Sequence, residues 1–63
     1  MEKLILEKLK HMVKSNKLKF GFQKEITEFI LDSYKEKNEN TIVCICKYIE
    51  NGNIFQKLVE LNI

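Results

Sequence analysis

The stretch Thr-Ile-Val-Cys-Ile-Cys-Lys-Tyr-Ile at residues 41–49 decides how the rest of this chain can be arranged. Its side chains are apolar on more than one side whether the segment is a helix or a strand. The whole chain has only 63 residues, a size at which a single core sustains folding only narrowly. We therefore expect residues 41–49 to be the central element of a small domain or part of a surface that meets another chain.

Two secondary structures compete for residues 41–49. Its β-branched residues favour a strand, and the Asn51-Gly52 pair that follows is typical of a hairpin turn. Residues 53–56, however, have the spacing of a helix capping box. Five apolar residues then recur at helical spacing: Ile54, Phe55, Leu58, Val59 and Leu61. Because a lone strand is unstable without a partner, we predict helices on both sides of Gly52 and keep the strand as the open alternative for residues 41–49.

The first half of the chain predicts two further helices. Between Glu2 and Asn16, apolar residues fall on one arc of a helical wheel, and Asn16 can take the left-handed conformation that ends a helix. A second periodic run extends from Phe22 to Tyr34. The predicted fold is therefore all-α: residues 1–63 form a single small domain, a compact bundle of three to four short helices, with helices one and two antiparallel.

Charge is distributed unevenly along the chain. Residues 1–24 carry seven lysines and two acids, whereas residues 25–63 carry four lysines and seven acids, which leaves a net charge of +2. We expect the lysines of the first helix to lie beside an acidic stripe on the second: Glu25, Glu28, Asp32 and Glu36. The alternative is that the lysines face a nucleic acid, which is bound without base specificity because the chain has no Arg. The contacts would then be Lys3, Lys10, Lys14 and Lys17.

Several classes of protein are excluded by residue type and spacing. Cys44, Cys46 and His11 are too few for a zinc site or a disulfide framework, and His11 has no partner at a spacing typical of a catalytic triad. We predict no enzyme, no cofactor and no metal. No apolar run reaches the roughly 20 residues that cross a bilayer, and charge interrupts the N-terminal run too early for a signal peptide. We therefore predict a cytoplasmic protein with reduced cysteines.

The apolar excess of residues 41–49 leads to the functional prediction. A monomer of this size can cover one face of the segment, so the other face is expected to form a homodimer or to bind a target protein. The predicted interface is Val43, Cys44, Tyr48, Phe55 and Val59. We predict a small non-catalytic regulatory or inhibitory protein that acts through an apolar helical surface; the alternative is a non-specific nucleic-acid-binding protein that uses the lysines. The absence of Arg, Ala, Pro and Trp is typical of an AT-rich genome, and together with the small size it suits a phage or mobile element of such a host.

Overall fold

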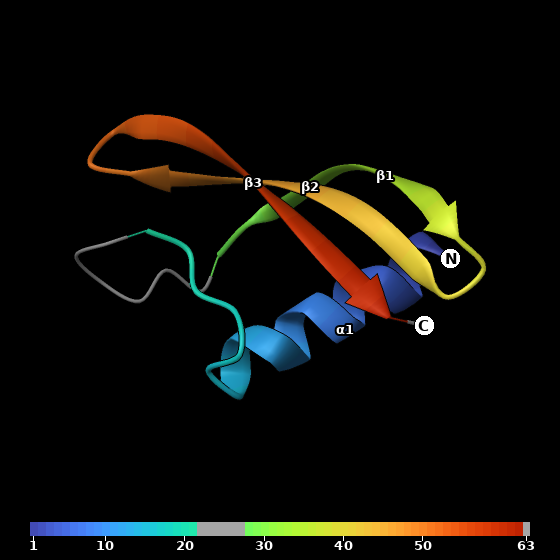
Figure 1. Ribbon diagram of the computed structural model, residues 1–63. Helices are drawn as coiled ribbons and strands as arrows, with labels where there is room; N and C mark the ends of the chain where they lie inside the picture. The colour runs from blue at the N-terminus through green and yellow to red at the C-terminus, as the bar shows by residue number, and fades with distance from the viewer. Residues whose placement is uncertain (22–27, 63) are drawn as a thin grey trace.

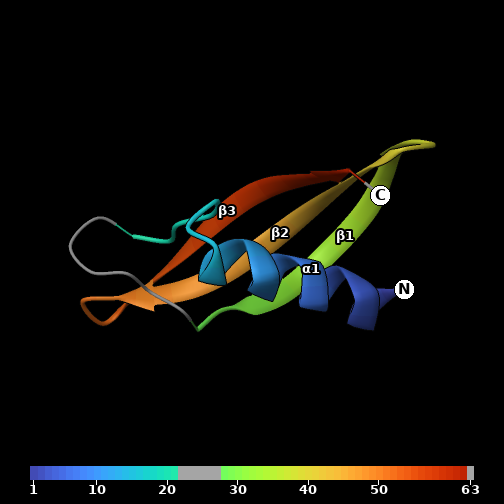
Figure 2. The same ribbon diagram turned by 90° about the horizontal axis from the view of Figure 1, so that it is seen from below.

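The chain forms one helix and a three-stranded antiparallel sheet, as seen in a computed structural model that describes residues 1–21 and 28–62 (Figure 1). The elements are α1 (Glu2–Lys14), β1 (Ile30–Asn38), β2 (Thr41–Glu50) and β3 (Asn53–Asn62). The strands lie in the order β1-β2-β3, so β2 is central. Helix α1 lies against one face of the sheet, which we call the inner face (Figure 2); within the described chain, no second layer covers the outer face (Figure 1).

This architecture contradicts the prediction of an all-α bundle. The two segments predicted as helices three and four are the strands β2 and β3. Residues 22–27 of the predicted second helix lie outside the described residues, and the remainder of that run enters β1 at Ile30. The antiparallel helix pair is therefore wrong as well. Only the first helix is confirmed, and Asn16 has the expected left-handed conformation, with φ of 61°.

The turn at Asn51-Gly52 explains why the strand prevails over the helix. Asn51 and Gly52 have φ values of 51° and 78°, and a two-residue hairpin turn of type I′ requires positive φ at both positions. Asn and Gly adopt this conformation at low cost. The strands then pair without interruption from Glu50 opposite Asn53 to Thr41 opposite Asn62. Strand β3 is thus the partner that a strand at residues 41–49 was predicted to lack.

Strand β1 pairs with β2 less regularly. The connecting turn is closed by the backbone N–H of Asn40, which donates to Asn38 Oδ1 over 2.9 Å. The register shifts between Leu31 and Ser33 and again between Glu36 and Asn38. Each shift inserts one extra residue on β1, as in a β-bulge, and a bulge bends the strand and interrupts its ladder.

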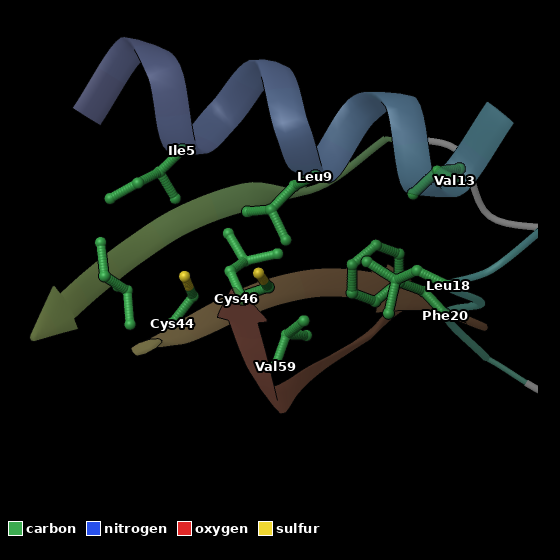
Figure 3. Close-up of a cluster of buried hydrophobic side chains, with 10 residues drawn as sticks. Ile5, Leu9, Val13, Leu18, Phe20, Cys44, Cys46 and Val59 are labelled. Atoms are coloured by element: carbon green, nitrogen blue, oxygen red, sulfur yellow. The ribbon is translucent and has the colours of Figure 1, made fainter. Parts of the chain in front are cut away.

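The hydrophobic core lies between α1 and the inner face (Figure 3). The helix contributes a residue at every fourth position, and β2 contributes every second residue, which are the periods of one face of a helix and one face of a strand. Among the described residues, the buried side chains are Ile5, Leu9, Val13, Leu18, Phe20, Ile42, Cys44, Cys46, Val59 and Leu61. The core therefore uses only one of the two apolar sides of residues 41–49.

Candidate interaction surface

The outer face of the sheet carries a second set of apolar side chains. On β2 the odd-numbered residues point to this face, because the even-numbered residues Ile42, Cys44 and Cys46 are buried on the inner face. The register places Ile54 opposite Ile49 and Leu58 opposite Ile45. We define the outer surface as the apolar residues on this face: Ile30, Val43, Ile45, Ile49, Ile54 and Leu58.

Most of the outer surface is open to solvent. Ile30, Ile49, Ile54 and Leu58 are 68%, 64%, 70% and 70% exposed. Val43 and Ile45, on the central strand, are half-buried between their neighbours. An antiparallel sheet with one solvated face normally carries polar residues there, and contiguous exposed apolar residues typically mark interaction sites. The outer surface is therefore the candidate interaction surface of this protein.

Two ion pairs interrupt and border the outer surface. Lys47 Nζ lies 3.4 Å from Asp32 Oδ1, and Lys37 Nζ lies 3.2 Å from Glu60 Oε1. The second pair joins β1 to β3 across the central strand. All four side chains are partly exposed, so each pair contributes about 0–1 kcal/mol. These pairs restrict the apolar residues to a band that lies mainly over β2 and β3.

A row of aromatic rings covers the inner face near the β2–β3 turn. The ring centroids of Phe20 lie 5.0 Å from Phe29 and 5.1 Å from Tyr48, and Tyr48 stacks on Phe55 at 5.7 Å. These separations are those of favourable aromatic pairs. Lys57 Nζ adds a hydrogen bond to the carbonyl oxygen of Lys19, 2.6 Å away. The segment that follows α1 is thus held against the inner face.

The structure separates the five residues predicted as the protein interface. Cys44 and Val59 are buried opposite each other in the core, and Tyr48 and Phe55 stack on the inner side. Only Val43 belongs to the outer surface. Sequence reasoning missed the other five outer-surface residues, although the Asn-Gly turn with period-2 alternation on either side would have placed Ile45, Ile49, Ile54 and Leu58 on one face.

Cys44 and Cys46 lie side by side on the inner face as unbridged thiols (Figure 3). Burial raises the pKa of Cys44, and burial followed by the neighbouring Cys44 raises the pKa of Cys46 to about 11. Because the thiolate is the nucleophile and the metal ligand, both groups are unreactive at neutral pH. Among the described residues, no three His, Cys, Asp or Glu side chains are placed to hold a metal ion. The two thiols pack as small hydrophobic groups.

The lysines predicted to contact nucleic acid are all exposed on or just after α1. They are Lys3, Lys10, Lys14 and Lys17. Within residues 1–21 and 28–62, none of them forms an ion pair with a carboxylate. The acidic stripe expected beside them is not formed as a helix face: Asp32 pairs with Lys47 on the sheet, and Glu25 lies outside the described residues. His11 is exposed in the last turn of α1.

In the part of the chain that the structure describes, no helix has the length and apolar character needed to cross a membrane. No family model matches this chain, and no curated protein or solved structure matches it. Two features of the molecule itself bear on its function: the apolar outer surface and the exposed lysines of α1.

Proposed function

We propose that this chain is a small non-catalytic regulatory or inhibitory protein that acts by binding another protein through the outer surface. The supporting observation is the exposure of Ile30, Ile49, Ile54 and Leu58 on one face of a sheet whose other face is already packed. Removing apolar area from water contributes roughly 25 cal/mol per Å². These four side chains are therefore the main source of binding energy available on that face.

An amphipathic helix of the partner protein is the occupant that fits the outer surface. On the inner face, α1 presents Ile5, Leu9 and Val13 to alternate residues of β2. The outer side of β2 offers Val43 and Ile45 at the same two-residue interval, so a helix of similar length can lie across it in the same way. Lys35 is exposed opposite Val43, which favours a helix with an acidic flank on that side.

The proposal is tested by affinity capture from cells that contain the protein, with three baits. The wild type is compared with Ile49→Lys, which places a charge inside the outer surface, and with Asn40→Lys, which adds the same charge in the β1–β2 turn. We expect a protein that the wild type and Asn40→Lys retain and Ile49→Lys loses. In the purified complex, the methyl NMR signals of Ile49, Ile54 and Leu58 should shift. A bound protein that Ile49→Lys retains at full strength, or that shifts no outer-surface methyl signal, would refute the proposal.

A second candidate function is non-specific nucleic-acid binding by α1. Its support is that Lys3, Lys10, Lys14 and Lys17 are exposed and form no ion pair within the described chain. Binding of this kind weakens steeply with salt, because each neutralised phosphate releases counterions. We would measure binding to heparin and to a random-sequence DNA duplex over a salt series. Replacing Lys10, Lys14 and Lys17 with Glu should abolish such binding and leave protein capture through the outer surface intact.

A further inference from the structure

The two edges of the sheet differ in how they are protected. The β1 edge carries two register shifts and a run of charged residues, Lys35, Glu36 and Lys37, the usual protection of an edge against pairing with another chain. Strand β3 pairs with β2 over ten consecutive residues without a shift. It has no proline and only two charged residues, Lys57 and Glu60. The β3 edge is therefore the one suited to pairing with a further strand.

The hairpin turn shows which main-chain groups of β3 point outward. In a hairpin with a two-residue loop, the flanking residues, here Glu50 and Asn53, form the hydrogen-bonded pair. Bonding to the neighbouring strand alternates along an antiparallel ladder. Odd-numbered residues of β3 therefore bond to β2, and the N–H and C=O groups of Ile54, Gln56 and Leu58 point away from it. Within residues 1–21 and 28–62, β3 has β2 as its sole sheet neighbour.

The exposed side chains of β3 are arranged symmetrically about Gln56. Ile54 and Leu58 precede and follow it by two residues, lie on the outer face, and are both 70% exposed. We propose that β3 pairs antiparallel with β3 of a second copy of this chain, with the two-fold axis at Gln56. Ile54 of each copy then lies opposite Leu58 of the other. A segment that matches its own reverse in this way is what a two-fold symmetric interface requires.

The neighbouring registers are less favourable. Centring the axis on Lys57 places two like charges directly opposite each other, which is destabilising. Centring it on Leu58 leaves each Ile54 opposite Asn62, so Leu58 with Leu58 is the one apolar pair on the outer face. With the axis at Gln56, Lys57 lies opposite Phe55 and Glu60 lies opposite Gly52, so no like charges face each other. This register pairs Ile54 with Leu58, the two most exposed large apolar residues of β3.

The resulting dimer is a continuous six-stranded sheet. Side chains that are opposite in an antiparallel ladder point to the same face, so the two outer surfaces form one larger apolar face that remains open to a partner. The contact itself is limited to about one strand from each copy, well below the roughly 1,600 Å² of a standard interface. We therefore expect dimerisation that depends on concentration. The proposal goes beyond the binding function, because it uses the main chain of the β3 edge.

Introducing a charge on the two-fold axis tests this register directly. Gln56→Lys brings two ammonium groups together on the axis, and Gln56→Glu brings two carboxylates together. In sedimentation velocity over a dilution series, we expect the wild type to dimerise as concentration rises and each variant to remain monomeric. An equimolar mixture of the two variants should dimerise again as a heterodimer. Ser33→Lys, an exposed outer-face position on the opposite edge, is the matched control and should dimerise like the wild type.

Amide hydrogen exchange provides a second measurement that does not depend on a substitution. The N–H groups of Gln56 and Leu58 point to solvent in the monomer, so their exchange should slow as the wild-type concentration rises. The N–H groups of Lys57 and Val59 bond to β2 and should be protected at every concentration. A wild type that stays monomeric at high concentration, or a Gln56→Lys variant that dimerises as well as the wild type, would overturn the proposal.

The outcomes also separate this dimer from the binding function. Ile49→Lys changes the outer surface on β2, one strand removed from the paired β3 edge, and should leave dimerisation unchanged. Because Gln56 lies between Ile54 and Leu58 on the outer face, capture of a partner by a single subunit is tested with wild type diluted below its dimerisation range, where it should persist. If dimerisation is lost in Ile49→Lys, two copies meet through their outer faces, and the edge-pairing proposal is wrong even where protein binding stands.

Discussion

The two faces of the sheet are both rich in apolar residues, but only one of them is buried in the folded protein. Strand β2 directs Ile42, Cys44 and Cys46 to one side and Val43 and Ile45 to the other. Helix α1 packs on the inner side and buries its residues almost completely, whereas the outer side keeps large aliphatic groups in water. The difference shows that apolar content alone does not make a core. A face is stabilised only when a second element with a matching period lies on it.

The two faces also differ in their expected roles: the inner face contributes to stability and the outer face to binding. Residues on the inner face contribute to the free energy of unfolding, because unfolding exposes them to water. Residues such as Ile54 and Leu58 are already exposed in the folded protein, so they contribute little to the free energy of unfolding. They contribute to the free energy of binding when a partner covers them. The predictions that follow compare equivalent changes on the two faces, in order of decreasing expected effect.

The largest difference is expected between Leu9→Ala and Leu58→Ala, which are the same chemical change on opposite faces. Leu9 is fully buried against the inner face, so its truncation should lower the free energy of unfolding by about 2–5 kcal/mol. Leu58 is mostly exposed, and its truncation should cost less than about 0.5 kcal/mol. Urea denaturation at low protein concentration measures both. Equal losses would show that the outer face is covered in the folded monomer.

Raising the pH should lower the free energy of unfolding, because Cys46 on the inner face ionises. Its pKa rises from an ordinary value of 9.0 to about 11 in the folded protein, so the folded state holds the thiol proton more tightly than the unfolded state. The stabilisation is complete below pH 9 and is lost as the pH rises towards 11. The loss is at most about 2–3 kcal/mol.

The control for this titration is Cys46→Val, which keeps an apolar group in the same place and cannot ionise. The two proteins differ in no other ionisable residue, so the difference between the two stability profiles reports the thiol. We expect the profiles to diverge above pH 9. Parallel profiles up to pH 11 would mean that Cys46 is accessible to water.

The turn between β2 and β3 fixes the register of the two strands and so decides which side chains lie on each face. Gly52→Ala tests how much this turn contributes to stability. A methyl group at residue 52 would meet no atom within 4 Å, but the φ of +78° is strained for any residue with a Cβ. We expect a loss of about 1–2 kcal/mol in thermal or urea unfolding. The cross-strand contact between Ile49 and Ile54 should persist in NMR spectra; a shift of that contact by one residue would show that the two faces had exchanged side chains.

The smallest effect is expected from Lys37→Gln on the outer face. The Lys37–Glu60 pair is 3.2 Å long and exposed on both sides, so removing it should cost less than about 1 kcal/mol, and less still in high salt. Lys35→Gln, on the same strand and without a carboxylate partner among the described residues, serves as the control. A loss of several kcal/mol at Lys37 would mean that the outer face stabilises the monomer.

The first helix could be predicted from the sequence because its signals are local and agree with each other. Ile5, Leu9 and Val13 repeat at one helical face, and Asn16 has the left-handed φ that ends the segment. Strand β3 was assigned wrongly because it is apolar on both faces. Its outer residues Ile54 and Leu58 and its inner residues Phe55 and Val59 together imitate helical spacing. The positive-φ turn at Asn51-Gly52 was the correct signal.

The candidate surface was predictable only in part. The expectation that residues 41–49 are apolar on more sides than one layer covers agrees with the half-buried outer positions of β2, but the particular residues depend on secondary structure. A helix places Cys44 and Tyr48 opposite Ile42, with Val43 beside the Ile42 face, whereas a strand separates Val43 from Cys44 and buries the latter. If a strand shifts by one residue, every side chain moves to the other face, so the whole interface changes.

The sequence by itself determined the local elements whose causes lie within a few residues: the amphipathic helix, its end at Asn16, the Asn-Gly turn and the apolar character of β2. Only the tertiary structure decided which side of β2 is covered. Both sides are apolar enough to be buried, so the choice depends on where α1 lies after the chain reverses direction. That placement depends on contacts between residues distant in sequence, such as Leu9 with the inner face, which no local pattern encodes.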